Sequence, residues 1–325
     1  MTGDGHTVMY RRPRFTRKAS SPLRLTGDDI AIVRAVAHHR FLRSTHLVRL
    51  LPHRSARKTI ERLTGLYHAG FLDRPRAQIN YFASTGSAPI VYALGNKGAE
   101  IVAEIEHAPP PLTDWTDKNR AVKRPYIEHA LLLADLMLPL EVGSRDKSAV
   151  EFVGGDALLA ALPTGTKRHD TPWTMTARLA QGGRRAAISV VPDAVFALHF
   201  KESNRRSFFF VEADRATMPI ARNDVSQSSF RRKLLSYLAA HNEKQHAERF
   251  GFPNLRVLTL TTSSERVASM LDAVREITGG RGSGMFLFTH ARMLATNPDP
   301  FTTPWQTTSG FVRIDDPPRL QIRGN

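Results

Sequence analysis

Three acidic residues stand at the ends of two very apolar segments. Asp193 opens the segment PDAVFAL, and Glu212 and Asp214 end the segment FFFVEAD. Side chains alternate between the two faces of a strand, so Glu212 and Asp214 share one side. If the two strands are neighbours, Asp193 and Glu212 can converge on one cation. We therefore take all three acids as candidate ligands for Mg²⁺ or Mn²⁺, ions that also bind phosphate. The alternative is that these carboxylates lie in solvent or pair with Arg215.

A lysine and a histidine are candidates to complete this site. Spacings of three and four place four residues on one face of a predicted helix: Phe230, Lys233, Leu234 and Tyr237. Lys233 is at the edge of this apolar stripe and can lean toward the acids, where it would stabilise charge on a phosphate. The alternative is a lysine whose stem covers apolar surface. His129, beside Glu128 on an earlier apolar helix, is a further catalytic candidate or else a packed core residue.

A second group of candidates is basic and lies in the segment RKTIERLTGLYHAGFLDRPR, residues 57–76. We predict a helix with Ser55 as its N-cap and Gly70 as its left-handed end. Its buried stripe is predicted to be Ile60, Leu63 and Tyr67. The candidate DNA-binding residues are Arg57, Lys58, Arg62, Arg74 and Arg76. Arginine at the start of such a helix suits the base edge of guanine, and the two later arginines suit phosphates.

The charge balance of the chain agrees with a polyanionic partner. Its 325 residues hold 46 Lys and Arg against 30 Asp and Glu, for a formal charge of +16. Nucleic acid is the usual partner of so basic a protein. A genome that favours arginine is the alternative explanation.

Several classes of protein are excluded by what the sequence lacks. There is no cysteine, so disulfides and Cys-ligated zinc or iron–sulfur sites are excluded. There is no apolar run long enough to span a membrane and no apolar signal core at the N-terminus. We expect a cytoplasmic protein without a membrane partner.

The first part of the chain predicts a DNA-binding domain. Residues 1–24 form a basic segment that we interpret as a flexible arm along phosphates, or as an unimportant terminus. Residues 25–107 predict three helices, two strands joined by ASTGSA, and a last helix. The first helix has Thr26 as a plausible N-cap. This order of elements is that of a winged helix-turn-helix, which serves DNA binding or, alternatively, protein contacts. The proline-rich segment that follows predicts a linker at 108–122.

The second part predicts an α/β domain over 123–295. A buried helix near 126–140 is followed by a strand, an irregular insertion at 155–187, and two central strands, AAISVVPDAVFALHF and RSFFFVEAD. One long helix, another strand, a helix and a final strand follow. The continuous apolar runs imply a sheet covered on both faces. Residues 296–325 are predicted to be an irregular tail.

This second part resembles the PD-(D/E)xK nuclease core. That family has an αβββαβ fold, an Asp at the start of one strand and Glu-x-Lys on the next. Pro192–Asp193 supplies the literal PD and Glu212 the acid, but Asp214 occupies the lysine position. Some members carry the lysine on the following helix, where this chain has Lys233. The fold class that we predict is α/β, an N-terminal winged helix-turn-helix followed by an αβββαβ PD-(D/E)xK-like core.

The whole chain resembles the replication-relaxation family of bacterial plasmids and other mobile elements. The resemblance rests on the order of six segments: LTGDDIAIVRAV, RLTGLYHAGFLDR with VYALGNKGAE, EHALLLADL, VPDAVFAL, FFFVEADRAT and KLLSYL. It implies a role in plasmid replication, relaxation or mobilisation, with double-stranded DNA and relaxase or replication proteins as partners. Because a winged helix often works as a dimer on pseudo-palindromic DNA, we expect a homodimer.

Three functions compete on this sequence. The first is a DNA-binding protein whose nuclease-like domain is degenerate, which Asp214 in place of lysine favours. The second is an active metal-dependent endonuclease or nickase of the PD-(D/E)xK type, which the joint presence of Asp193, Glu212 and Lys233 favours. The third is a transcriptional repressor that acts through the winged helix alone.

Overall fold

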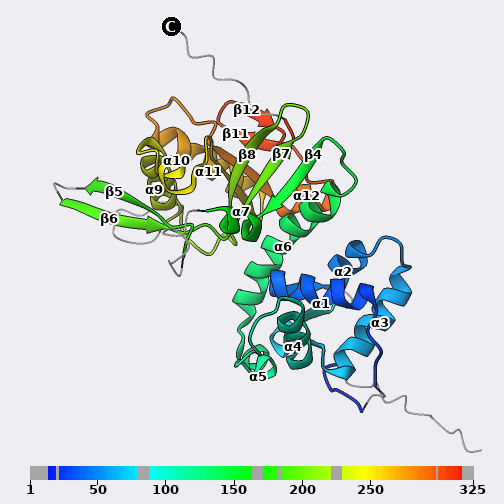
Figure 1. Cartoon of the computed structure of the whole chain (residues 1–325). Coiled ribbons are helices and arrows are strands. Elements are labelled where there is room, and N and C mark those ends of the chain that lie inside the picture. The colour runs from blue at the N-terminus through cyan, green and yellow to red at the C-terminus, as the bar shows by residue number, and fades with distance from the viewer. Residues whose placement is uncertain are drawn as a thin grey trace, which may run out of the picture. The chain divides into compact units, whose positions relative to one another are not determined.

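The structure is a computed structural model of the chain (Figure 1). It describes residues 14–19, 22–79, 88–162, 171–181, 184–220, 229–297 and 299–316, without the side chains of 179–181 and 184–186. The loop ASTGSA apart from Ala88, most of the predicted basic arm and the last residues of the predicted tail lie outside these ranges. Two compact units are present, residues 1–130 and 131–325, and the division falls within the helix α6 (Arg124–Ser144).

The first unit combines helices with a small antiparallel sheet. Its elements are, in chain order, α1 (Gly27–His39), β1 (Phe41–Arg43), α2 (Ser44–Leu50), α3 (Ala56–Ala69), β2 (Leu72–Asp73), a 3₁₀ turn at Arg76–Gln78, β3 (Val91–Leu94), α4 (Asn96–Ile105) and α5 (Trp115–Ala121). The strands are ordered β1-β3-β2. The predicted linker at 108–122 therefore contains a helix, α5, whose N-cap is Asp114. The earlier of the two strands predicted after α3 is only two residues long before the chain turns.

The predicted ends of α1 and α3 are confirmed. Thr26 caps α1, and Asp29 returns the bond to the backbone of Thr26 in a reciprocal capping box. Ser55 caps α3 by accepting a hydrogen bond from the backbone of Lys58. Gly70 ends α3 with φ of +90°, a left-handed conformation that a residue with Cβ adopts at a cost. Local chemistry thus fixes where the helix with the basic residues begins and ends.

The predicted buried stripe of α3 was partly wrong. Ile60 is 47% exposed, and the buried residues are Thr59, Leu63, Leu66 and Tyr67. These lie at spacings of four, seven and eight, which is one face of a helix. The face is rotated relative to our prediction because threonine at 59 turns inward. Its hydroxyl donates to the carbonyl oxygen of Ser55, so the buried hydroxyl keeps a partner.

The second unit is built on a seven-stranded mixed sheet. Its core elements follow α6 in the order β4 (Val150–Gly154), β7 (Ala194–Phe200), β8 (Arg205–Ala213), α9 (Phe230–Asn242), β9 (Arg256–Thr261), α11 (Ser264–Ile277) and β10 (Phe286–His290). Strands β4, β7 and β8 are antiparallel neighbours, and β9 is parallel to β8 and β10. The predicted order of helix, three strands, helix and strand is therefore present.

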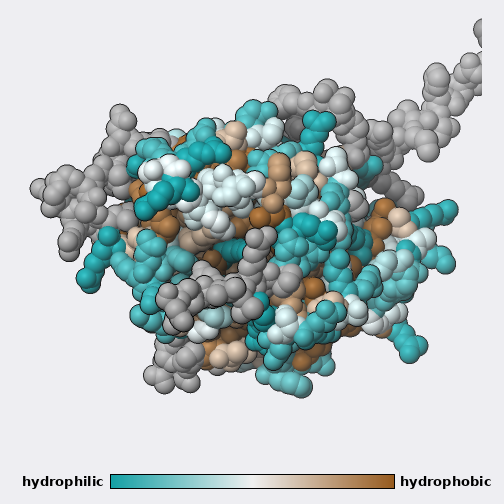
Figure 2. All heavy atoms as spheres, turned by 90° about the horizontal axis from the view of Figure 1, so that it is seen from above, coloured by the Kyte–Doolittle hydropathy of each residue, from teal (hydrophilic) through white to brown (hydrophobic). Residues whose placement is uncertain are grey.

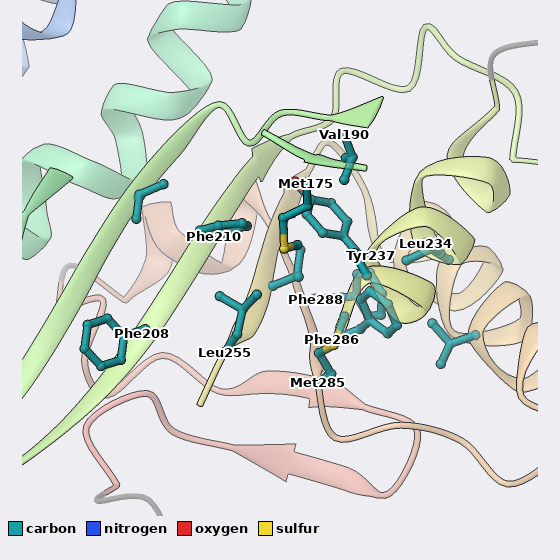
Figure 3. Close-up of a cluster of buried hydrophobic side chains, with 14 of the residues drawn as sticks. Met175, Val190, Phe208, Phe210, Leu234, Tyr237, Leu255, Met285, Phe286 and Phe288 are labelled. Carbon is teal, nitrogen blue, oxygen red and sulfur yellow. The ribbon is translucent and has the colours of Figure 1, made fainter. Parts of the chain in front are cut away.

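Both faces of this sheet are covered, as the continuous apolar strands predict. On one face, Phe208 and Phe210 of β8 pack with Leu234 and Tyr237 of α9, and α11 belongs to the same cluster. Figure 3 shows side chains of β8, β10 and α9 converging in this cluster. On the other face, the alternate residues Phe209 and Val211 join a second cluster with α6. The even-numbered residues of β8, Glu212 among them, therefore point to the α9 side.

The segment predicted as an irregular insertion at 155–187 is ordered for much of its length. It contains α7 (Gly155–Ala161) and most of a hairpin of β5 (Met175–Gln181) and β6 (Arg184–Val190). The strands form a sheet of their own, which extends from the body of the unit in Figure 1. Met175 and Val190 of the hairpin belong to the α9-side cluster. The predicted strand AAISVVPDAVFALHF is therefore two strands in two sheets, because the chain leaves β6 at Val190 and enters β7 at Ala194.

Two other predictions were also wrong. The single long helix is two helices, α9 and α10 (Gln245–Phe250), separated by Lys244, which has φ of +56°. The predicted irregular tail contains β11 (Trp305–Thr307) and β12 (Gly310–Val312), which extend the large sheet beside β10. Trp305 and Phe301 are completely buried in the α6-side cluster, so apolar burial holds this segment.

The surface of the molecule carries both hydrophilic and hydrophobic residues. Figure 2 shows hydrophilic residues spread over much of the face in view, with hydrophobic residues in small areas between them. Within the residues that the structure describes, no helix has the length and apolar character needed to cross a membrane.

Candidate functional site

Asp193 and Glu212 lie on neighbouring strands. The register pairs Ala194 of β7 with Val211 of β8, which brings the residues just outside that pair next to each other. The backbone N–H of Asp193 donates to the carbonyl oxygen of Val211 at 2.9 Å. Its carboxylate Oδ2 accepts from the backbone N–H of Ala213 at 2.8 Å. Asp193 is thus fixed beside Glu212 while its side chain stays at the exposed entrance to β7.

Glu212 is enclosed by two residues of α9. Its residue is 2% exposed. Lys233 Nζ donates to Oε2 at 2.5 Å, and the Tyr237 hydroxyl donates to Oε1 at 2.5 Å. Lys233 and Tyr237 are one helical turn apart, so both reach the same carboxyl group. The structure therefore brings together three of the four predicted catalytic residues, Asp193, Glu212 and Lys233.

The environment changes the acidity of this cluster. Burial raises the pKa of Glu212 to about 7; the ammonium of Lys233 opposes this shift and the charge of Asp193 adds to it. Burial lowers the pKa of Lys233, but the charges of Glu212 and Asp193 outweigh it and raise the value overall. The Glu212 carboxyl thus exchanges its proton near neutral pH, which is a property common at functional sites.

Asp214 has a different set of partners, although it shares the α9 side of β8 with Glu212. Its carboxylate accepts two hydrogen bonds from the Arg266 guanidinium of α11, at 3.0 and 3.1 Å. Thr261 Oγ1 donates to the same carboxylate at 2.8 Å. Both members of this ion pair are almost buried. Asp214 thus joins the end of β8 to α11, and both oxygens of its carboxylate accept hydrogen bonds that stabilise the fold.

His129 belongs to the first compact unit, since the division of the chain follows Ala130. It is half-buried on α6. Its neighbour Glu128 is paired with Arg124 at 2.7 Å, one turn earlier on the same helix. Glu212 and Lys233 belong to the second unit.

The acid pair offers hard oxygen ligands of the type that Mg²⁺ prefers. Both oxygens of Glu212 accept hydrogen bonds, however, and the Lys233 ammonium is the counter-ion of this carboxylate. The residue types fit a divalent cation. The geometry fits one only if Lys233 moves away from Oε2, because the two cations would compete for that oxygen.

The basic residues of α3 divide into two groups. Arg57 and Lys58, at its N-terminal end, are exposed. The only partner described for the Arg57 side chain is Glu61, one turn later, at 2.9 Å, in a pair whose members are both more than half exposed. Such surface pairs are weak. The outer face of α3, which we define as Arg57, Lys58, Ile60 and Glu61, therefore presents its charges to solvent.

Arg62 and Arg74 point inward instead. Arg62 makes a two-pronged ion pair with Asp29, at 2.7 and 2.5 Å, and Asp29 is completely buried. Arg74 is 9% exposed, and its guanidinium lies over the ring of Tyr67, 4.3 Å from the centroid. Its Nη2 donates to Thr64 Oγ1 and to the hydroxyl of Tyr92. These two arginines hold the first unit together.

Arg76 follows β2 and is exposed. Near it, the described part of the predicted flexible arm packs back onto the first unit. Arg17 donates to the carbonyl oxygens of Tyr67 and Leu72 and forms an ion pair with Asp73. The segment 14–19 therefore does not extend away from the domain.

Sequence reasoning missed the roles of Tyr237 and Arg266. The spacing of Tyr237 puts it on the helical face of Lys233, a signal that we interpreted as apolar packing only. Arg266 is 52 residues from Asp214, and no local pattern joins them. A long-range partner of this kind is visible only once the fold is known.

The comparisons with known proteins assign a family. The family model described as Replication-relaxation matches residues 33–255, more than half of the chain. This chain belongs to the replication-relaxation family. The predicted family membership is therefore confirmed. No curated protein matches the sequence of this family member.

One comparison among solved structures is with a chain titled "Structure of SdaI restriction endonuclease". The two sequences are 12% identical, and the match covers 76% of this chain and 82% of that chain, with a TM-score of 0.19. At that score, the likeness carries no argument about fold or function.

Proposed function

We propose that this replication-relaxation family member is a DNA-binding protein that acts in the replication, relaxation or mobilisation of a plasmid or other mobile element. Its first unit would be a winged helix-turn-helix, with α3 as the recognition helix. The observation that carries the proposal is the division of α3. One face is committed to the core, and the outer face holds Arg57 and Lys58 in solvent at the N-terminal end.

The first unit supports this proposal through its element order. Three helices, with α2 and α3 in succession, are followed by β2 and β3 of a three-stranded sheet. In winged helix-turn-helix proteins the N-terminal residues of the second helix of the motif contact base edges. Arginine and lysine there pair with guanine, and exposed Ile60 suits the methyl group of thymine. The formal charge of +16 would add the attraction that any duplex exerts.

The test is the binding of a fluorescently labelled duplex to the full chain, followed by anisotropy over a range of salt. We expect binding that weakens with salt, because phosphate contacts release counter-ions. The double variant Arg57→Ala, Lys58→Ala should bind at least tenfold more weakly, since each side chain removed costs about 1 kcal/mol or more of binding free energy. The matched control is a double alanine variant at Arg292 and Arg34, two exposed arginines outside α3. Equal losses of affinity in both double variants, or no binding by wild type, would refute the proposal.

A second candidate function is metal-dependent cleavage of DNA by a PD-(D/E)xK-like second unit. The specific observation in its favour is the placement of Asp193 beside Glu212 with Lys233 reaching the same carboxyl group. In this mechanism Asp193 and Glu212 would hold Mg²⁺ or Mn²⁺, and the ion would activate water near a phosphate. Lys233 would leave Glu212 and stabilise phosphate charge. Asp214 would have no part in the site, since Arg266 occupies its carboxylate.

Cleavage is tested by incubating supercoiled plasmid with the full chain in Mg²⁺, Mn²⁺ or EDTA, with Glu212→Ala in parallel. Nicking that needs the metal and disappears in the variant would support this candidate. Retardation of DNA without cleavage under any metal would leave the DNA-binding function alone, with the acid pair and Lys233 as a structural unit.

A further inference from the structure

The first unit contains a hollow away from the outer face of α3. Its volume is about 450 Å³, within the range of sites for small ligands. Three segments that are distant in the sequence form most of its wall, and Tyr67 of α3 completes it. The three segments are the described part of the N-terminal arm at Phe15 and Arg17, the end of β2 with the chain after it at 73–76, and α5 at Thr116, Asn119 and Arg120.

The wall of this hollow is rich in positive charge. It contains four arginines, Arg17, Arg74, Arg76 and Arg120, and one acid, Asp73. Asp73 is already engaged, because its carboxylate pairs with Arg17 and accepts hydrogen bonds from the backbone of Arg74 and from Asn119. Asp73 neutralises one of the four guanidinium groups, and Asp117, outside the wall, pairs with that of Arg120. An excess of positive charge therefore remains.

Two of the four arginines can reorient toward a ligand. Arg120 pairs with Asp117 three residues earlier, and both side chains are about two-thirds exposed or more, at 72% and 66%. An exposed pair of this kind contributes little and yields easily to a stronger partner. Arg76 is exposed after β2. Both therefore stand at the rim with long side chains that can close over an anion.

Arg74 is a fixed charge in the wall. Its guanidinium contacts the rings of Tyr67 and Tyr92, at 4.3 and 5.1 Å from their centroids. Its Nη1 donates to the carbonyl oxygen of Arg14, and its buried Nε has no partner among the described residues. A guanidinium held in this way gives up little freedom when an anion binds nearby.

We propose that this hollow binds a phosphate group. Guanidinium groups match phosphate oxygens through paired N–H donors, and Arg76 and Arg120 would grip them at the rim, with Arg17 and Arg74 adding charge behind. The phosphate can come from the backbone of DNA or from a free phosphate compound. The backbone is the source that follows from the proposed DNA-binding function, on which this inference rests. DNA would then contact the first unit at α5 and the N-terminal arm as well as at α3.

The test uses the full chain and the double variant Arg76→Gln, Arg120→Gln, with Arg292→Gln as a control on an exposed arginine of the second unit. In one arm, duplex affinity is measured by anisotropy as a function of salt. Because both arginines are assigned to one phosphate group, their loss should reduce the slope of log K against log salt by about 0.9. In the other arm, inorganic pyrophosphate is titrated into each protein and followed by calorimetry.

A reduced salt slope in the double variant alone supports the hollow as a subsite for the DNA backbone. Pyrophosphate binding that disappears in the double variant and persists in the control supports the site with a free phosphate source. The inference is overturned if the double variant keeps the wild-type slope and the wild type does not bind pyrophosphate, or binds it equally in all three proteins. If wild type binds no duplex, the proposed function fails. The pyrophosphate titration still tests whether the hollow binds phosphate.

Discussion

The outer face of α3 and the end of β8 both concentrate charged side chains, but they use them in opposite ways. Arg57 and Lys58 extend into solvent, and the surface pair with Glu61 constrains little. Glu212 is buried and the side chain of Asp214 is almost buried, and each carboxylate has partners from a neighbouring helix. Charges in water are available to an external partner. Buried charges must be compensated by partners within the fold. They become available for chemistry only when those partners move away.

The same contrast exists within the basic residues of the first unit. Arg57 and Arg62 are five residues apart on one helix, yet Arg62 is bound to completely buried Asp29. Residue type alone therefore does not identify a DNA contact. Which side of the helix an arginine occupies decides whether its charge serves the fold or a ligand, and the following substitutions test that division.

The largest effect is expected at the Asp214–Arg266 pair. Arg266→Ala leaves an almost buried carboxylate without its guanidinium, which costs about 3–5 kcal/mol of unfolding free energy. Urea unfolding of the full chain, followed in the second unit, measures this destabilisation. Arg292→Ala, on an exposed position of α12 (Ala291–Thr296), should change stability by about 0.5 kcal/mol at most. Equal stabilities of the two variants would contradict a structural role for Asp214.

The second effect concerns the pH dependence at Glu212. Its pKa in the fold is about 7, above the ordinary value of 4.5, so the folded state favours the protonated carboxyl. Its contribution is most favourable below about pH 4.5 and is lost as the pH rises through 7. Relative to Glu212→Gln, the wild type should therefore lose stability over this window, by about 3 kcal/mol at most. Unfolding of both proteins between pH 5 and 8 measures the difference, and parallel curves would show that Glu212 titrates normally.

The third effect separates the two faces of α3. Arg62→Ala removes the partner of buried Asp29 and should cost about 2 kcal/mol of stability. Arg57→Ala should leave the unfolding free energy almost unchanged but weaken duplex binding. Thermal unfolding and anisotropy on the same two variants measure both properties. A stable Arg62→Ala variant with impaired DNA binding would reverse our assignment of these residues.

The smallest effect is expected at Asp193. Its charge raises the pKa of Glu212, so Asp193→Asn should move the Glu212 titration to a lower pH. The shift should be less than about one pKa unit, because Asp193 lies at the exposed entrance to β7. NMR of the carboxyl carbon of Glu212 follows this titration directly. A Glu212 pKa that does not move would mean that the two acids do not interact.

The sequence predicted those features that depend on neighbouring residues. Thr26, Ser55 and Gly70 mark helix ends through local hydrogen bonds and backbone conformation, and each was identified correctly. The strands β4, β9 and β10 were predicted from their apolar runs. The spacing of Lys233 and Tyr237 predicted that they share a helical face, and the structure places both against Glu212.

Features that depend on distant residues or on weak local signals were not predicted. The arginine that binds Asp214 lies 52 residues away in the sequence. The short strands β11 and β12 pair with each other across only a few residues, and their local signal is weak. The sequence did contain a signal for the β5–β6 hairpin. Residues that alternate between apolar and polar flank Gly182–Gly183, a dipeptide typical of tight turns. The charges and glycines of this segment are equally typical of irregular structure, which is what we predicted there. The inward position of Arg62 depends on Asp29, which lies 33 residues away in the sequence.

The central claim, that the outer face of α3 contacts DNA, is tested most directly by photo-crosslinking. Lys58 is replaced by p-benzoylphenylalanine in the full chain, and Arg292 is replaced in the same way as a control. Each protein is irradiated with a labelled duplex at a salt concentration at which the wild type binds. We predict a protein–DNA crosslink from position 58 and none from position 292. A crosslink from position 292 alone, or from neither position although the duplex is bound, would contradict the assignment of α3 as the recognition helix.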